Sequence, residues 1–138
     1  MQATVKWVDG AMFVGETGSG HAIVIDGPAD IGGRNMGMRP MELLLLGVGG
    51  CSSVDVVTIL KNSKQDVTDC RVEIEAERAD AVPAVFTKIH LKFLVSGHEL
   101  KDSIVKRAVD MSATKYCSAS IMMQAAGVDL THSYEIVV

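Results

Sequence analysis

One stretch of the chain, residues 39–61, is apolar on nearly every side of the helix that it predicts. Four leucines stand in a row at positions 43–46, and valines and isoleucine carry the apolar run onward to position 60. Pro40 suits the first turn of such a helix and Lys61 its last turn. At about 22 residues the helix is roughly 33 Å long, the width of a small domain. A helix without a polar side belongs inside a protein, so we expect a long, buried central helix.

Three glycines interrupt this helix just before Cys51. In a helix interior, each glycine costs about 1 kcal/mol relative to alanine. Gly47, Gly49 and Gly50 therefore indicate that another backbone packs close to this segment. A chain of 138 residues can hardly cover such a helix alone, so the pattern favours a second subunit as part of the cover.

Alternating apolar and polar residues before the helix predict three strands, at residues 4–8, 12–16 and 21–26. The pair Asp9-Gly10 offers the positive-φ positions of a tight hairpin turn between the first two strands. We therefore expect a three-stranded antiparallel meander. A glycine-rich loop at residues 27–38 then leads into the helix.

After the helix, residues 67–77 and 86–95 alternate as half-buried strands, with glutamates on the outer face of one and lysines on the outer face of the other. Pairing these two charged faces would stabilise an antiparallel hairpin modestly. His90 lies on the wet face, which favours a solvated cross-strand partner over a catalytic role. Cys70 lies on the inward face of an ordinary strand and is expected to be inert core.

The C-terminal part predicts an amphipathic helix at residues 100–115, a short helix at 118–127 and a last strand at 129–138. Ser118 is a plausible N-cap for the short helix. His132 is on the apolar face of the last strand, where a satisfied core histidine is more common than a ligand.

The resulting order, β-β-β-α-β-β-α-α-β and mostly antiparallel, defines an α+β fold. A length of 138 residues suits a single domain, residues 1–138. Apolar residues make up 48% of the chain, which is rich for this size, so part of the apolar surface is expected to be buried against a second copy.

Charge and aromatic content argue against a nucleic-acid binder, because the net charge is −4, no basic run is present and aromatics are only 4% of the chain. The first ten residues alternate like a strand and lack the regions of a signal peptide, so we expect a cytoplasmic protein. Glu42 and Asp55 fall inside the apolar helix and would be costly in lipid, which argues against a membrane span.

The three cysteines form neither a disulfide framework nor a zinc motif with ligand spacing, and we expect no metal or cofactor. Their settings differ. A sulfur at a helix N-terminus, as expected near Cys117, gains thiolate character from the helix dipole. Cys51 lies mid-helix and should resist ionisation unless a cation approaches; on the residues alone it is more consistent with buried core.

The run from Pro40 to Leu45 that leads to Gly49-Gly50-Cys51 and Asp55-Val56, with Lys115-Tyr116-Cys117-Ser118 later, resembles the OsmC/Ohr family, and within it the YhfA-like branch. The resemblance covers essentially the whole chain. It implies an OsmC-like fold in which antiparallel sheets wrap around the long central helix, and an intertwined homodimer.

The resemblance also implies a chemistry. Cys51 would attack the O–O bond of an organic hydroperoxide and become a sulfenic acid, and Cys117 would condense with it to a disulfide. A dithiol, possibly a lipoyl group, would then reduce the disulfide. On this reading the protein is a thiol-dependent hydroperoxide reductase, with peroxiredoxin-like activity and a role in oxidative or osmotic stress defence.

This chain departs from the family pattern at the activating residues. The family carries an arginine in the early strands, but residues 1–33 contain none, and Met41 stands where the family has a glutamate. Glu42 is one residue further on, a rotation of about 100° around a helix. Arg34 and Arg39 are the available cations near the helix start. Ser118 replaces a common proline. Either arginine could replace the family cation, and Arg39 and Glu42 are taken as the candidate supporting residues.

Two other classes remain open. One is a dimeric binding or redox-sensing protein that holds a small hydrophobic molecule near Cys51, and the absent activating residues favour it. The other is a metal site of Cys51, Cys117 and His132, which the wide separation of these residues disfavours.

Overall fold

The computed structural model describes all residues, 1–138. They form two compact units, Met1–Leu46 and Gly47–Val138. Helix α1, Pro40–Asn62, begins in the first unit and continues in the second, within one residue of the predicted bounds at each end. The helix has the length and hydropathy of a membrane span. These properties are weak evidence for a membrane-spanning helix, because core helices of soluble proteins have them too.

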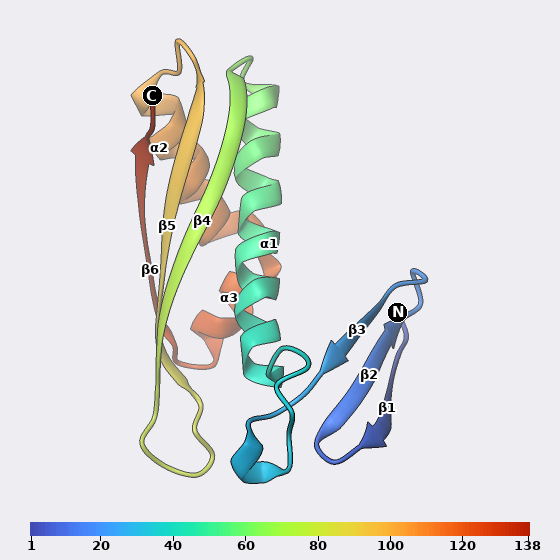
Figure 1. The fold of residues 1–138 in the computed structure, drawn as a ribbon. Coiled ribbons are helices and arrows are strands. Elements are labelled where there is room, and N and C mark those ends of the chain that lie inside the picture. The colour runs from blue at the N-terminus through green and yellow to red at the C-terminus, as the bar shows by residue number, and fades with distance from the viewer. The chain divides into compact units, whose positions relative to one another are not determined.

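The N-terminal unit is built on the predicted meander. Strands β1 (Ala3–Asp9), β2 (Met12–Thr17) and β3 (Ala22–Ile25) pair antiparallel in the order β1-β2-β3 (Figure 1). The first turn lies one residue later than predicted: Asp9 is still in the strand and pairs with Met12, and Gly10 alone takes a positive φ, of 53°. A register shift between Trp7 and Asp9 moves the turn, because it adds a residue to one side of the ladder.

This sheet has little core of its own. Every residue of β1 is exposed, and Trp7 keeps 62% of its surface accessible. Val5 and Ile23, on the same face as Trp7, are exposed as well. Apolar side chains of β-branched and aromatic type favour a half-buried strand surface. This apolar face is therefore not covered within the N-terminal unit.

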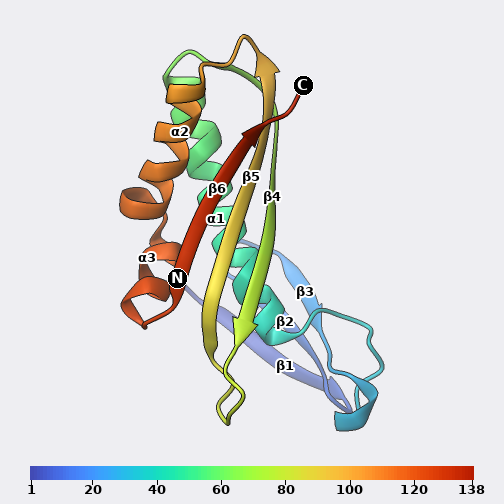
Figure 2. The same cartoon turned by 90° about the vertical axis from the view of Figure 1, so that its left-hand side faces the viewer.

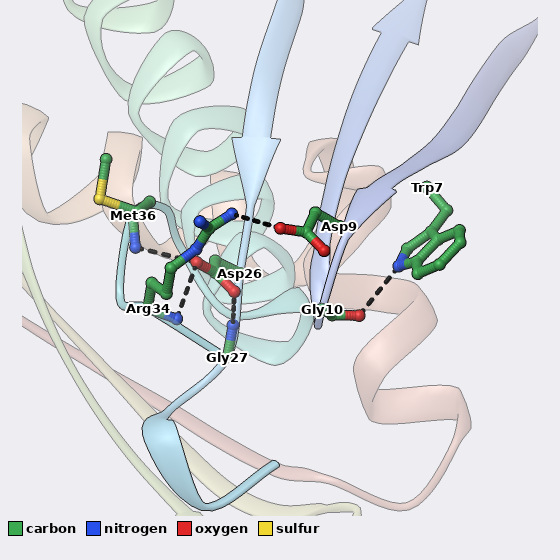
Figure 3. A network of polar contacts seen from close by, with 7 residues as sticks. All are labelled: Trp7, Asp9, Gly10, Asp26, Gly27, Arg34 and Met36. Carbon is green, nitrogen blue, oxygen red and sulfur yellow. Dashed lines mark hydrogen bonds and ion pairs between the residues drawn. The ribbon is translucent and has the colours of Figure 1, made fainter. Parts of the chain in front are cut away.

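The loop after β3 is organised by one buried carboxylate, Asp26, which is only 2% exposed. It accepts backbone hydrogen bonds from Gly27 at 2.7 Å, Met36 at 3.1 Å and Arg34 at 3.2 Å (Figure 3). The guanidinium of Arg34 also forms an ion pair with Asp9 at 3.2 Å. These contacts close the predicted glycine-rich loop, which contains the short 3₁₀ helix η1 (Ala29–Ile31), onto the start of the unit.

The C-terminal unit contains the second sheet, of β4 (Asp66–Arg78), β5 (Phe86–His98) and β6 (Asp129–Ile136). β4 and β5 are antiparallel and place Glu73 opposite Lys92 and Glu77 opposite Lys88, as the charged faces predicted. His90 lies opposite Glu75, and its ring nitrogens contact hydroxyls of β6. β6 runs parallel to β5 and is the one exception to the expected antiparallel pairing. The helices between them supply the crossover that a parallel pair requires.

Three helical segments connect β5 to β6: α2 (Asp102–Met111), the π-helical turn η2 (Ser112–Tyr116) and α3 (Ser118–Ala125). The amphipathic helix predicted at 100–115 thus changes winding after Met111. These helices and α1 lie on one side of the second sheet (Figure 2). The core between them consists of fully buried apolar side chains, chiefly Val48, Val56, Leu60, Ile89, Leu91, Phe93, Val95, Val105 and Val109.

Within the C-terminal unit, helix α1 is covered on one side only. At Gly49 an added Cβ would lie 2.6 Å from Ile74 Cδ1 of β4, so a side chain of the second sheet, and not the predicted backbone, packs close to this glycine. At Gly47 and Gly50 an added Cβ would meet nothing within 4 Å. Leu46 is 51% exposed and Val54 66% exposed. The predicted burial on all sides is therefore not reached within the C-terminal unit alone.

We predict that Asp26→Asn loosens the loop, and that the effect depends on pH. The backbone N–H of Gly27, then those of Met36 and Arg34, hold the pKa of the Asp26 carboxyl below its ordinary value of 3.8, in spite of burial. A carboxyl with a lowered folded-state pKa stabilises the fold above its ordinary pKa, and the contribution is lost as the pH falls through the folded value.

Amide hydrogen exchange at Gly27, Arg34 and Met36 is the measurement. Protection should be lower in Asp26→Asn than in the wild type at neutral pH, and the difference should vanish in strong acid. Asp30→Asn, an exposed acid in the same loop, is the control and should have no effect. Equal protection in wild type and Asp26→Asn at neutral pH would contradict the role assigned to this carboxylate.

Candidate functional site

The site begins at the N-terminus of α3, where Cys117 is the N-cap residue. Its backbone is extended, with φ −74° and ψ 102°, and its sulfur accepts a hydrogen bond from the backbone N–H of Ser120 at 3.3 Å. The predicted N-cap, Ser118, is instead the first helical residue. The thiol takes the position that a serine or aspartate oxygen usually occupies, because the sulfur also satisfies a free N–H of the first turn.

A buried group of serines surrounds this sulfur. The hydroxyl of Ser52 donates to Cys117 Sγ at 3.2 Å and lies 3.2 Å from Ser120 Oγ. Ser112 Oγ donates to the carbonyl of Ser52 at 3.1 Å. Sequence reasoning missed these serines. Polar residues on the buried sides of otherwise apolar helices were the signal that could have found them.

Cys51 lies beside Cys117, as the resemblance implied. Its sulfur, the sulfur of Cys117 and a carboxylate oxygen of Asp55 are all within 4.8 Å of one another. The backbone of Ala119 hydrogen-bonds to Cys51, so the first turn of α3 serves both sulfurs. Cys117 is fully buried whereas Cys51 is partly accessible. Both cysteines are free thiols.

The two thiols differ in acidity. Burial raises the pKa of Cys51, and the neighbouring Cys117 and Asp55 raise it further. Burial also acts on Cys117, but hydrogen bonds from Ser120 and Ser52 outweigh it and lower the pKa of that thiol. Negative charge is therefore favoured at Cys117 over Cys51. This order agrees with the expectation that a helix N-terminus favours a thiolate and a mid-helix position does not.

Asp55 was not predicted as a site residue. It follows Cys51 by one helical turn, so both side chains point from the same face of α1. Its Oδ2 atom is buried and has no hydrogen-bond partner, and burial raises the pKa of this carboxyl. A buried carboxylate oxygen without a partner is rare in proteins and calls for an explanation.

The metal cluster considered from the sequence is not the one that forms. His132 lies elsewhere, with its Nε2 atom 2.8 Å from Asp110 Oδ1, and is thus a satisfied histidine as expected. Cys70 is half-buried on β4, opposite Val95, apart from the other two cysteines in the fold. The acidic and thiol groups that do come together are Cys51, Asp55 and Cys117.

The two candidate supporting residues belong to the N-terminal unit and have partners there. Glu42 Oε1 accepts the backbone N–H of Arg39 at 2.8 Å and so caps the start of α1. The Arg39 guanidinium donates to Asn35 Oδ1 at 2.8 Å and to the carbonyl of Gly37 at 3.2 Å. The main groups that shift the pKa of Cys51 all belong to the C-terminal unit.

The C-terminal unit has a cavity of about 360 Å³ that Asp55 lines in part. The cavity therefore adjoins the group formed by Cys51, Asp55 and Cys117. Arg107 of α2 and Tyr116 of η2 also line it. The lining is mixed polar and apolar, which suits a small organic molecule better than a purely polar ion.

These features define a two-cysteine α+β protein whose thiols meet at a helix N-terminus. The family model for OsmC-like proteins matches residues 32–133. Protein YhfA of Escherichia coli strain K12 is 50% identical over 137 residues, which cover 99% of this chain and 98% of that protein. The chain therefore belongs to the OsmC-like family.

Solved structures agree on the fold. An OsmC-like protein of Mycoplasma pneumoniae superposes with a TM-score of 0.84 at 13% identity, covering 99% of this chain and 96% of that one. The organic hydroperoxide resistance protein OhrB of Bacillus subtilis superposes with a TM-score of 0.66 at 17% identity, covering 97% and 96%. The α+β fold predicted from the resemblance is thus confirmed.

We predict that Ser52→Ala destabilises the protein by about 1–2 kcal/mol, because it removes a buried hydroxyl that donates to Cys117 and contacts Ser120. Denaturant unfolding of the reduced protein measures the loss. Ser53→Ala, at the half-buried neighbouring position outside this group, is the matched control and should change stability by less than about 0.5 kcal/mol. Equal effects of the two substitutions would contradict the role of the Ser52 hydroxyl.

Proposed function

We propose that this protein reduces organic hydroperoxides with Cys51 and Cys117 as a redox pair. The observation that carries the proposal is the meeting of two sulfurs, from α1 and from the start of α3, within 4.8 Å of each other. Two thiols that close suit disulfide formation. The site also offers one accessible sulfur and one buried sulfur, which suits an attacking and a resolving role.

The chemistry proceeds in two steps. The Cys51 thiolate attacks one peroxide oxygen, an S–O bond forms, the O–O bond breaks, and the alkoxide takes up a proton to leave as an alcohol. Cys51 is then a sulfenic acid. Cys117 attacks that sulfur, an S–S bond forms and the hydroxyl leaves as water. Two electrons pass from the thiols to the peroxide, and a dithiol, of which a lipoyl group is one example, returns them.

The neighbouring thiols of Cys51 and Cys117 allow the proton transfer that the first step needs. Ser120 and Ser52 stabilise negative charge on Cys117, and Cys51 hydrogen-bonds to it. A proton can therefore pass from Cys51 to Cys117 when a peroxide arrives, and Cys51 becomes the nucleophile. Cys117 then attacks as the buried, already oriented partner.

The substrate class follows from the relatives and the surroundings. OhrB is named an organic hydroperoxide resistance protein, and this chain shares its fold. The leucines, valines and methionines around α1 favour an organic peroxide over hydrogen peroxide. A cytoplasmic location and a role in stress defence belong to the same proposal.

We propose further that the working form is a homodimer and that residues 1–138 act as one domain within it. The support is the uncovered apolar surface of the first sheet and of α1, including Trp7, Leu46 and Val54. Arg39 and Glu42 keep a supporting role in this proposal, with Arg39 as the cation that favours a thiolate at the site.

A dimeric binding protein is the second candidate. The observation that favours it is the lack of a cation among the groups that shift the pKa values of Cys51 and Cys117. The main causes of those shifts are burial, hydrogen bonds, the other thiol and, at Cys51, Asp55. A helix cysteine without an activating cation reacts slowly with peroxide. In that case the cavity beside Asp55 would hold a small hydrophobic molecule without turnover.

The redox proposal predicts one intramolecular disulfide. Metal-free, reduced protein treated with a slight excess of an alkyl hydroperoxide should yield a single Cys51–Cys117 cross-linked peptide pair in mass spectrometry. Cys117→Ser should leave a Cys51 sulfenic acid that dimedone traps, because the resolving thiol is gone. Cys51→Ser should abolish peroxide consumption.

Cys70→Ser is the matched control and should behave as the wild type, because Cys70 lies on a separate strand. If all three thiols of the wild type remain free and alkylatable after denaturation, the redox proposal is wrong. The binding-protein candidate then takes its place, and consumption of peroxide with dihydrolipoamide should be absent as well.

The proposed dimer predicts that a charge introduced on the exposed side of α1 weakens self-association. Val54→Glu should weaken self-association by more than about 10-fold, because an unpaired carboxylate at an apolar interface is costly. Gly50→Ala should also weaken it, although alanine favours the helix within one chain. Sedimentation equilibrium measures both.

Val85→Glu is the control, since Val85 is an exposed valine in the connection between β4 and β5. It should leave association unchanged. A wild-type protein that sediments as a stable, folded monomer at micromolar concentration would rule out the obligate dimer.

A further inference from the structure

We propose that Cys51, Asp55 and Cys117 form a binding site for a thiophilic divalent cation in the reduced protein, with Zn²⁺ as the preferred ion. The ligand atoms of these three side chains lie within 4.8 Å of one another. This site departs from the expectation of no metal, which rested on the absence of a sequence motif. The motif is absent because α1 supplies two ligands and the start of α3 the third.

The geometry fits zinc with little rearrangement. Zinc binds thiolate sulfur at about 2.3 Å and carboxylate oxygen at about 2.0–2.2 Å, so tetrahedral ligands are about 3.5–3.8 Å apart. Small side-chain rotations that move the two sulfurs and the carboxylate oxygen by about 1 Å would bring them to those separations. Cys51 and Asp55 are one turn apart on a helix, a spacing that places two ligands on one face.

A second and independent observation is the buried oxygen Oδ2 of Asp55, which has no hydrogen-bond partner. A disulfide between the two cysteines does not need this carboxylate. A Zn²⁺ held by this carboxyl group would give it a partner and balance the charge of two thiolates and a carboxylate at once.

The surroundings supply the remaining elements of a metal site. Ser52 Oγ and the N–H of Ser120 already donate to Cys117 Sγ, as groups around a ligating sulfur commonly do. Three protein ligands leave one of the four positions of zinc open. The cavity that Asp55 lines can deliver water or a small ligand to that position.

Metal binding and the proposed redox chemistry exclude each other at the same sulfurs, and this consequence rests on the proposed function. A hydroperoxide takes two electrons from the two thiolates, so an S–S bond forms, the O–O bond breaks, and an alcohol and, with protons from solvent, water are released. Asp55 is then the only protein ligand left. The cation is released, and conversely a bound cation protects the reduced pair.

Cobalt is the probe. Reduced, chelator-treated full-length protein is titrated with Co²⁺, and thiolate-to-cobalt charge transfer and tetrahedral ligand-field bands are recorded, followed by displacement with Zn²⁺. We expect one equivalent per chain. Cys51→Ser should weaken binding by about 100-fold or more and Asp55→Asn by about 10-fold or more, since even residues behind the ligands contribute 10- to 100-fold.

Cys70→Ser and Asp69→Asn are the matched controls, a cysteine and an acid adjacent in β4, and should bind as the wild type. Absence of the charge-transfer bands in the wild type, or bands that survive in Cys51→Ser and vanish in Cys70→Ser, would overturn the site. Asp55→Asn keeps the shape of the side chain and guards against a loss caused by misfolding.

The two proposals fail separately. A metal-free protein that forms the Cys51–Cys117 disulfide but never binds Co²⁺ would overturn the cation site and leave the redox function intact. A protein that binds Co²⁺ through Cys51 and Asp55 but is not oxidised after chelation would support the site and overturn the redox function. If both hold, disulfide formation should be slower in the zinc-loaded protein than after chelation.

Discussion

The first turn of α3 is the constraint on which the candidate site depends. Its free backbone N–H groups need acceptors, and two sulfurs provide them: Ser120 donates to Cys117 and the backbone of Ala119 to Cys51. The helix start thus fixes the two cysteines side by side and stabilises negative charge between them. Because this turn follows the π-helical segment η2, the change of winding after Met111 is part of what aims Cys117 at α1.

The same arrangement explains the unequal roles of the two thiols. Cys117 receives hydrogen bonds from a backbone N–H and from Ser52, whereas Cys51 is surrounded by acidic neighbours and apolar burial. Charge is therefore favoured at the sulfur that a reagent cannot reach and disfavoured at the accessible one. In the proposed redox chemistry a proton shared between the two sulfurs would resolve this conflict, and in the proposed cation site a bound cation would.

Much of the fold could be predicted from the sequence because its signals are local. The alternation of β1 to β5, the apolar run of α1 and the Glu–Lys faces of β4 and β5 each depend on residues near one another in the chain. The position of the first hairpin turn could not, since it depends on a bulge that leaves no pattern. The parallel pairing of β6 was missed although the two helices predicted between β5 and β6 are the crossover that a parallel pair requires. The pairing of Cys51 with Cys117 came from the family resemblance rather than from spacing.

The part of the site that sequence reasoning missed is polar and buried. Ser52 and Ser120 are small residues in apolar helices, and Asp55 looked like a charge that merely argued against a membrane. Their role appears only when α1 and α3 are packed together, because each satisfies or opposes a group on the other helix. Asp55 is the most informative of the three. A carboxylate costs free energy when it is buried with an oxygen left without a partner. Such a group is tolerated where it serves a bound ligand, so this unpartnered oxygen marks the part of the C-terminal unit where a functional site is expected.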